Sequence, residues 1–262
     1  MGDLRVSMNK KGQVTIFIIV ALLIIAIAAL VYILSPGLSS SIGRDSNNPY
    51  DFMQTCLEDD VNNNVEIISL QGGSTEPEHT YLYDDSNIEY LCYTNEYYLP
   101  CIMQQPLLKQ HIETEIKNSI SGLVEQCFAA MGESFEKKGY DASLNTGELE
   151  VNISENSLAI IFEGYEFTIT KGETERYDEL KVELADNNLY ELIMIANSIL
   201  DWEVEYGDVD IATYMNYYPH IKTEKKIQDD GTAIYILTDR DTEFKFQFAS
   251  RSIAWPAGYP QR

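Results

Sequence analysis

Three histidines are the first residues to consider for catalysis or metal binding, because imidazole titrates near neutral pH and binds metals. They are His79, His111 and His220. No two of them stand four positions apart, the spacing that places two ligands on one face of a helix. We expect His111 to lie on a helix surface. The chain also lacks a glycine-rich phosphate loop, a nucleophile elbow and a C-x-x-C pair, so its sequence makes no case for an enzyme or a cofactor.

A group of carboxylates is the next candidate. Asp239, Asp241 and Glu243 alternate along one predicted strand edge, with Asp229 and Asp230 nearby in the sequence. Carboxylates that converge at about 2.3–2.6 Å from an ion bind calcium. No EF-hand spacing is present, however, and a chain this acidic produces such groups by chance. The solvated-face interpretation is therefore favoured, and no metal site is predicted.

The four cysteines are Cys56, Cys92, Cys101 and Cys127. An even number in an external domain predicts two disulfides, for which three pairings exist. The nine-residue separation of Cys92 and Cys101 suits a local bridge around an aromatic loop. Cys56 and Cys127 fall on the apolar faces of two predicted helices, which favours their pairing. A four-cysteine zinc site is the alternative, disfavoured because no C-x-x-C knuckle occurs.

Tyrosine is abundant, with 18 residues in the chain. Exposed tyrosines make efficient contact residues because they offer a large amphipathic area at low entropic cost. Tyr97 and Tyr98, between Cys92 and Cys101, therefore suggest a binding surface, although tyrosines also simply fill external loops. A separate feature is Asn152, which opens the chain's single Asn-x-Ser/Thr sequon and is a candidate glycosylation site within a predicted strand.

The periodicity of apolar residues indicates the elements that must position these groups. Three- and four-residue steps predict helices over about 52–71, 106–138 and 186–201. Alternation predicts six strands, over 148–154, 158–162, 166–170, 221–227, 233–238 and 244–249. The acidic, tyrosine-rich residues 74–103 are expected to form an irregular excursion. We therefore expect an α+β domain of helices and antiparallel strands, braced by disulfides, over residues 51–262, preceded by a linker at 35–50.

A 21-residue run without a charge, Val14 to Leu34, precedes that linker. As a helix it would extend roughly 31 Å, close to the hydrocarbon thickness of a bilayer. Fifteen of its residues are Ile, Leu, Val or Phe, which favours membrane insertion by about 5–9 kcal/mol in total. The run therefore predicts a transmembrane helix in contact with the lipid bilayer.

The charges on either side of this run predict its orientation. Arg5, Lys10 and Lys11 precede it, which places the N-terminus in the cytoplasm and the large domain outside the cell as a single-pass membrane protein. Three of the 18 basic residues and one of the 42 acidic residues precede the run, which leaves 15 against 41 and a formal charge of −26 outside. Such an acidic surface argues against nucleic acid as a partner.

The segment Lys10-Lys11-Gly12-Gln13, followed directly by the apolar run, resembles a class III signal peptide of archaeal type IV pilin-like proteins. That resemblance implies cleavage between Gly12 and Gln13 by a prepilin-type peptidase, with residues 1–12 as the leader and 13–34 as the retained helix. Many pilins carry glutamate at the fifth mature position, where this chain has Phe17. The rest of the chain is similar to large uncharacterised archaeal membrane-anchored proteins, a likeness that implies no activity.

The hypothesis that follows is a non-enzymatic, pilin-like surface protein. Its external domain would serve adhesion, filament formation or cell-surface interaction, with other pilin-like subunits or surface proteins as partners. The alternative is a single-span extracytoplasmic subunit of an envelope or secretion complex that does not polymerise. The absence of an acid at Phe17 leans slightly toward this alternative.

Overall fold

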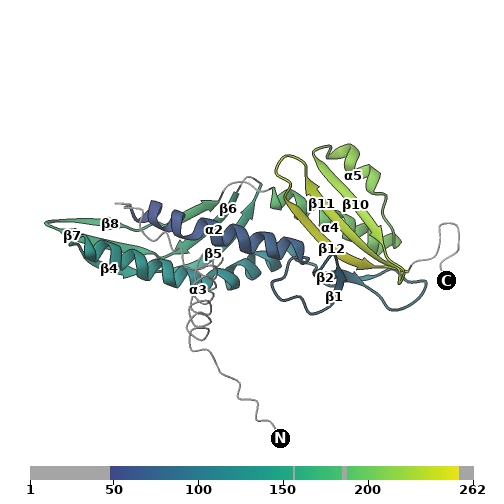
Figure 1. Cartoon of the computed structure of the whole chain (residues 1–262), viewed down its shortest axis with the longest axis horizontal. Coiled ribbons are helices and arrows are strands. Elements are labelled where there is room, and N and C mark those ends of the chain that lie inside the picture. Colours follow the sequence, from purple (N-terminus) through teal and green to yellow (C-terminus); the bar gives the residue numbers. More distant parts are fainter. Residues whose placement is uncertain (1–47, 156, 185–187, 254–262) are drawn as a thin grey trace, which may run out of the picture. The chain divides into compact units, whose positions relative to one another are not determined.

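A computed structural model describes residues 48–155, 157–184 and 188–253 (Figure 1). The chain divides into two compact units, 1–45 and 46–262, and every described residue belongs to the second. The expected leader with Lys10, Lys11, Gly12 and Gln13, and the apolar run Val14 to Leu34, lie outside the described residues. Within the described ranges, no helix has the length and apolar character needed to cross a bilayer.

Two antiparallel helices form the first layer. α2 (Pro49–Leu70) begins at Asn48, whose side chain accepts a hydrogen bond from Tyr50 N–H at 3.0 Å. α3 (Leu108–Lys137) packs against it through a continuous apolar stripe. A disulfide joins Cys56 near the start of α2 to Cys127 in the second half of α3, with 6.0 Å between their Cα atoms. The bridge therefore ties together two helices that are 71 residues apart in sequence.

Two three-stranded sheets pack against these helices. Their strands are β4 (Asp141–Asn145), β5 (Glu148–Ser154), β6 (Ser157–Glu163), β7 (Glu166–Lys171), β8 (Glu173–Tyr177) and β9 (Lys181–Leu184). One sheet has the order β4-β7-β8 and the other β5-β6-β9. In chain order β4 leads into β5, β6 into β7 and β8 into β9, whereas β5–β6 and β7–β8 form antiparallel hairpins, so the two sheets are two halves of one antiparallel meander. The meander changes sheet near Gly147 and Gly164, where both residues have positive φ.

The largest sheet has six strands: β1 (Thr80–Tyr83), β2 (Ser86–Tyr93), β3 (Ile102–Met103), β10 (Ile221–Ile227), β11 (Thr232–Asp239) and β12 (Lys245–Arg251). Its order is β1-β2-β12-β11-β10, with β3 added to β2. All pairs are antiparallel except β12 with β2. α4 (Leu189–Tyr206) packs on β2, β3, β11 and β12, and α5 (Ile211–Tyr217) packs on β10.

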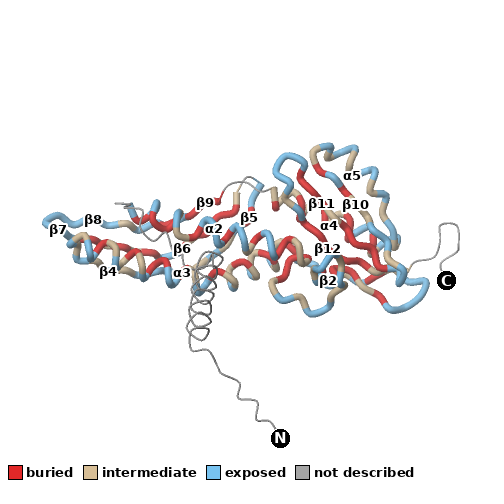
Figure 2. The backbone as a smooth tube through the Cα atoms, viewed as in Figure 1, coloured by how far each residue is buried: buried red, intermediate tan, exposed pale blue. Residues whose placement is uncertain are grey.

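The main core lies between this sheet and α4 and continues between α2, α3 and the meander. Figure 2 shows buried backbone along α4, β11 and β12 and along the facing sides of α2 and α3. Alternate residues of the large sheet form a second, smaller cluster on its other face: Ile88, Tyr90, Ile234 and Ala249. Both faces of the central strands are therefore buried.

Several sequence expectations are confirmed and some are wrong. The α+β class, the two disulfides and all six predicted strands are present, as are helices at the three predicted places. Residues 74–103 were expected to be irregular, but they contain β1, β2 and β3, because backbone pairing with distant β12 orders this segment. β4, β8, β9 and α5 are additional, and α4 continues to Tyr206, five residues beyond the predicted end.

Candidate binding surface

The segment 94–100, closed by the disulfide between Cys92 and Cys101, is the candidate binding surface; we name it the aromatic loop. Its tip carries Tyr97, which is 70% exposed, and Tyr98, which is 51% exposed. Leu99 follows and is also exposed, as is Ile102 just beyond the bridge. Large apolar side chains at adjacent exposed positions are typical of contact surfaces. Tyr97 and Tyr98, which the sequence suggested as contact residues, are therefore both exposed and available for contact.

The base of the aromatic loop is held by the C-terminal end of β12. Thr94 N–H donates to the carbonyl of Arg251 at 3.0 Å, and the Arg251 guanidinium donates back to the carbonyl of Thr94 at 2.7 Å. On the other side of the loop, Cys101 N–H donates to Ser252 Oγ at 3.0 Å and Ile253 N–H donates to the carbonyl of Leu99 at 3.3 Å. Four hydrogen bonds and one disulfide thus hold a loop of seven residues.

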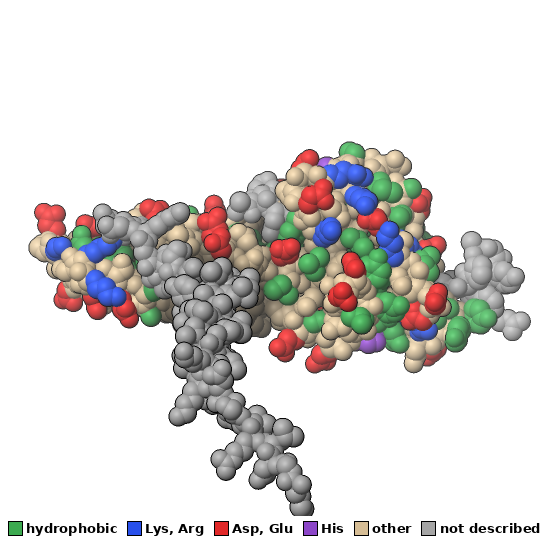
Figure 3. Space-filling model, in the orientation of Figure 1, with side chains coloured by type: hydrophobic (Ala, Val, Ile, Leu, Met, Phe, Trp, Pro, Cys, Tyr) green, Lys and Arg blue, Asp and Glu red, His purple; other side chains and the backbone are tan. Residues whose placement is uncertain are grey.

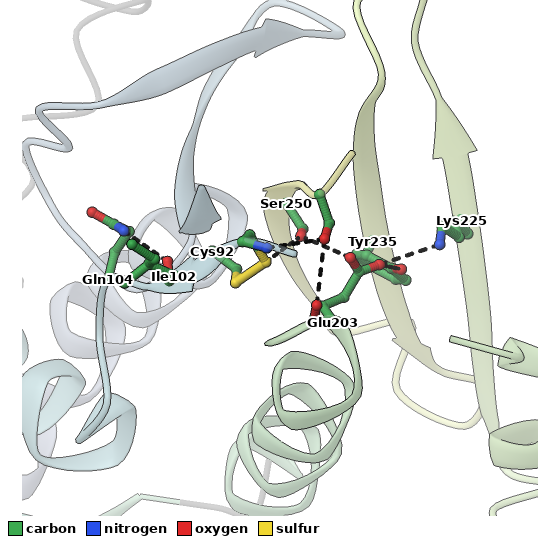
Figure 4. The surroundings of a disulfide bond; sticks show 9 residues. Cys92, Ile102, Gln104, Glu203, Lys225, Tyr235 and Ser250 are labelled. Atoms are coloured by element: carbon green, nitrogen blue, oxygen red, sulfur yellow. Dashed lines mark hydrogen bonds and ion pairs between the residues drawn. A yellow bond between two sulfur atoms is a disulfide. The ribbon is translucent and has the colours of Figure 1, made fainter. Parts of the chain in front are cut away.

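A buried carboxylate lies beneath the disulfide (Figure 4). Glu203, on α4, is only 2% exposed and accepts a hydrogen bond from Ser250 Oγ at 3.3 Å. The same Ser250 hydroxyl lies 3.6 Å from Cys101 Sγ. Lys225 of β10 reaches Glu203 Oε1 at 3.2 Å, and the hydroxyl of Tyr235 donates to the same oxygen. A charge this deeply buried needs such partners, because desolvation without them costs several kcal/mol.

These groups connect α4 with β10, β11 and β12. Burial, followed by the charge of Glu203, raises the pKa of Tyr235 well above its usual range. The phenol therefore stays protonated and acts as a fixed donor at neutral pH. Because Ser250 contacts both Glu203 of α4 and Cys101 of the disulfide, we interpret the network as the support that fixes the aromatic loop on α4.

The burial of Glu203 could have been predicted from the apolar pattern of its helix. The apolar face of α4 includes Ala196, Ile199 and Leu200, and the next position on that face, three residues after Leu200, is Glu203. A carboxylate at an apolar position of a helix indicates a buried partner. The sequence does not identify that partner, because Lys225 and Tyr235 lie on strands more than 20 residues away.

A second polar cluster brings together a serine, a histidine and a carboxylate. Ser74 Oγ donates to Glu89 and lies 2.8 Å from His111 Nε2. In a catalytic triad the serine donates to histidine and the acid orients the imidazole from its other nitrogen. Here the serine hydroxyl donates directly to the acid, an arrangement that differs from that of a triad. His111 lies on α3, as expected, and is half-buried, because Ser74 in the segment after α2 contacts its ring.

The other two histidines also have partners. His220 Nε2 lies 2.7 Å from Glu191 Oε2, at the start of α4. The His79 ring packs against Tyr90 and Tyr93, with centroid distances of 4.7 and 4.2 Å. These contacts account for each ring through packing or a hydrogen bond, and none of them brings two histidines together.

The carboxylates around Asp239 do not converge. Asp239 ends β11 and accepts hydrogen bonds from the N–H groups of Asp241 and Thr242 and from the Asn188 side chain. Burial alone would raise its pKa, but these hydrogen bonds outweigh burial and hold the pKa below its usual value. Within the described ranges, no group of three or more His, Cys, Asp or Glu side chains is arranged to hold a metal ion.

The other predicted site residues within the described ranges are Asn152 and the four cysteines. Asn152 is exposed on β5, opposite Ala159 of β6. The disulfides join Cys56 with Cys127 and Cys92 with Cys101, the two pairs that the sequence favoured. No family model, no curated protein and no solved structure matches this chain.

Proposed function

We propose that this chain is a pilin-like, single-span surface protein without enzymatic activity, and that its external domain contacts other cell-surface molecules through the aromatic loop. The observation that carries the proposal is the disulfide-closed loop with Tyr97 and Tyr98 exposed at its tip. A loop fixed before binding loses little entropy on association, and tyrosine contributes contact area with few rotatable bonds.

The N-terminal sequence supports the membrane part of the proposal. Lys10, Lys11 and Gly12 stand before Gln13 and the apolar run Val14 to Leu34, as in a class III signal peptide. Cleavage after Gly12 would remove the basic leader and leave the hydrophobic helix attached. This helix would then anchor the external domain in the cell membrane or pack with those of other pilin-like subunits.

The alternative is an extracytoplasmic subunit of an envelope or secretion complex that does not polymerise. One observation favours it: Phe17 occupies the fifth position of the expected mature chain, where a glutamate helps to register subunits in many pilins. Electron microscopy of producing cells separates the two. Filaments that disappear when this chain is deleted favour the pilin-like role, and their absence favours the alternative.

The contact role is tested by substituting the two tyrosines together. We expect Tyr97→Ala with Tyr98→Ala to lower cell–cell or cell–surface attachment by about thirtyfold, because two central aromatic contacts contribute about 1 kcal/mol or more each. The matched control is Tyr217→Ala on α5, whose side chain is 79% exposed. Unchanged attachment in the double variant, with normal amounts of protein at the surface, would contradict the proposal.

Processing is tested by intact mass. Protein recovered from its native membrane should begin at Gln13. A chain that begins at Met1 would exclude the pilin-related pathway, and a Gly12→Val variant should retain the leader if the peptidase reads this glycine.

A further inference from the structure

A groove runs between α3 and the β4-β7 part of the meander, away from the aromatic loop. Its volume is about 460 Å³, within the range of ligand-binding clefts. Its floor is apolar and includes Phe128 of α3, Leu144 of β4 and Phe167 of β7. Phe128 and Phe167 are buried, so the floor belongs to the core and is fixed by packing.

Small residues of α3 keep the groove open. Ala129 and Gly132, three positions apart, line it on the helix side. A Cβ atom at Gly132 would meet no other atom within 4 Å, so the space in front of this glycine is empty. Glycine also destabilises the middle of a helix by about 1 kcal/mol relative to alanine. Gly132 therefore leaves room where a larger residue would fill the groove and favour the helix.

The rim of the groove is acidic. Glu125, Glu133 and Glu136 all line it from α3. Glu133 pairs with Lys137 at 3.1 Å, on an exposed surface. Over the described ranges, Glu125 and Glu136 form no ion pair, so two carboxylates beside an apolar floor lack a cation. Figure 3 shows that acidic side chains are spread widely over the visible face, and three of the chain's glutamates line this groove beside its apolar floor.

The strand beside the groove also has a free edge. β4 is the end strand of its sheet and pairs only with β7 among the described strands. Ala142 and Leu144 of this strand line the groove. An edge strand offers unpaired N–H and C=O groups to an extended peptide, and adjacent pockets then take alternate side chains of that peptide.

From this geometry we propose that the groove binds an extended segment of a partner protein in which apolar side chains alternate with lysine or arginine. The apolar side chains fill the space in front of Gly132, and the cations meet Glu125 and Glu136. This interaction is separate from the contact role of the aromatic loop, because the two surfaces share no residue. Either one can fail without affecting the other.

The test uses the full chain in nanodiscs of zwitterionic lipid, with empty nanodiscs as background. The probe is a fluorescent peptide, Lys-Leu-Lys-Leu-Lys-Leu-Lys, and binding is followed by anisotropy. Two further peptides serve as references: one with serine in place of leucine, and one with glutamate in place of lysine. We expect the Lys-Leu peptide to bind at least tenfold more tightly than either reference.

The deciding variant is Gly132→Leu, which should weaken binding of the Lys-Leu peptide at least tenfold by filling the groove. Its matched control is Gly122→Leu on the same helix, where a Cβ atom also meets nothing within 4 Å but which does not line this groove. Gly122→Leu should bind within twofold of wild type. Thermal unfolding of both variants checks that they are folded.

The charge requirement is tested by Glu125→Gln with Glu136→Gln, which should weaken binding three- to tenfold. Glu58→Gln with Asp59→Asn on exposed positions of α2 changes the net charge equally and should have little effect. Equal binding to wild type and Gly132→Leu would overturn the proposal, as would equal binding of the serine peptide. A dimer of the full chain that Gly132→Leu dissociates would also overturn it, by assigning the groove to a second copy.

Discussion

Tyr235 donates a hydrogen bond to Glu203 inside the core, where a strand of the large sheet faces α4. The carboxylate is 2% exposed, and Lys225 lies both 3.2 Å from it and over the Tyr235 ring, 5.1 Å from the ring centroid. Ser250 donates a further hydrogen bond to the carboxylate, on the side of the Cys92–Cys101 disulfide. A buried charge, its cation and two hydroxyl donors therefore connect α4 to three strands beneath the aromatic loop.

Removing the Tyr235 hydroxyl should destabilise the fold. A hydrogen bond to a charged group contributes about 1.5–3 kcal/mol, and its loss leaves Glu203 under-satisfied in the core. We expect Tyr235→Phe to lower the free energy of unfolding by that amount, measured by urea denaturation. Tyr217→Phe, at an exposed position, should change it by less than about 0.5 kcal/mol. Equal stability of the two variants would show that the buried network contributes nothing.

Glu89 should make stability depend on pH in the acidic range. Burial raises its pKa, against the opposing effects of the Ser74 hydrogen bond and the charge of His111. Because the folded-state pKa lies above the unfolded value of about 4.5, the stabilisation is fully present below pH 4.5 and lost as pH rises through the folded pKa.

The variant that tests this effect is Glu89→Gln, which cannot titrate. The difference in unfolding free energy between wild type and Glu89→Gln should favour wild type more at pH 4.5 than at pH 7. Glu115 and His111 face the same cluster and are unchanged in the variant, so their effects largely cancel in this comparison. A difference that does not vary with pH would contradict the prediction. Glu163→Gln, at an exposed position, serves as the control.

The two disulfides should contribute unequally to stability. In the chain-entropy model the contribution grows with the length of the closed loop, and the separations are 71 residues for Cys56–Cys127 and 9 for Cys92–Cys101. Replacing the first pair by serine should cost about 4 kcal/mol and replacing the second about 2.5 kcal/mol. Unfolding of the two double-serine variants measures both values, and a reversed order would contradict this expectation.

Gly147 should tolerate alanine much less well than Gly164. Both have positive φ, +71° and +76°, which costs an alanine about 1–2 kcal/mol. A Cβ atom at Gly147 would also lie 2.5 Å from the carbonyl oxygen of Glu163 and 2.8 Å from Tyr165 N, whereas at Gly164 it would meet nothing within 4 Å. We expect Gly147→Ala to be less stable than Gly164→Ala by about 1–3 kcal/mol. Similar melting temperatures for the two variants would refute the steric explanation.

Some of the fold could be predicted because its signal lies in neighbouring residues. The four-residue steps from Ile112 to Ile116 and Ile120 indicate α3, and all three side chains are fully buried on one face. The placement of Cys56 and Cys127 on two such faces then favoured their pairing. The strand β8 shows the reverse case, since its sequence Glu173–Tyr177 is almost wholly exposed and lacks the alternation that a half-buried strand has.

The sequence by itself determined the positions of the main helices and of six strands and the acidic charge, and it favoured the two cysteine pairs that the structure contains. Only the tertiary structure decided that residues 74–103 form strands, that Glu203 meets Lys225 and Tyr235, and that Gly132 opens a groove. The physical reason is the range of the interactions. Helical and strand periodicity arise between residues a few positions apart. The hydrogen bond from Cys101 N–H to Ser252 Oγ, in contrast, joins residues 151 positions apart, which only the folded chain brings together.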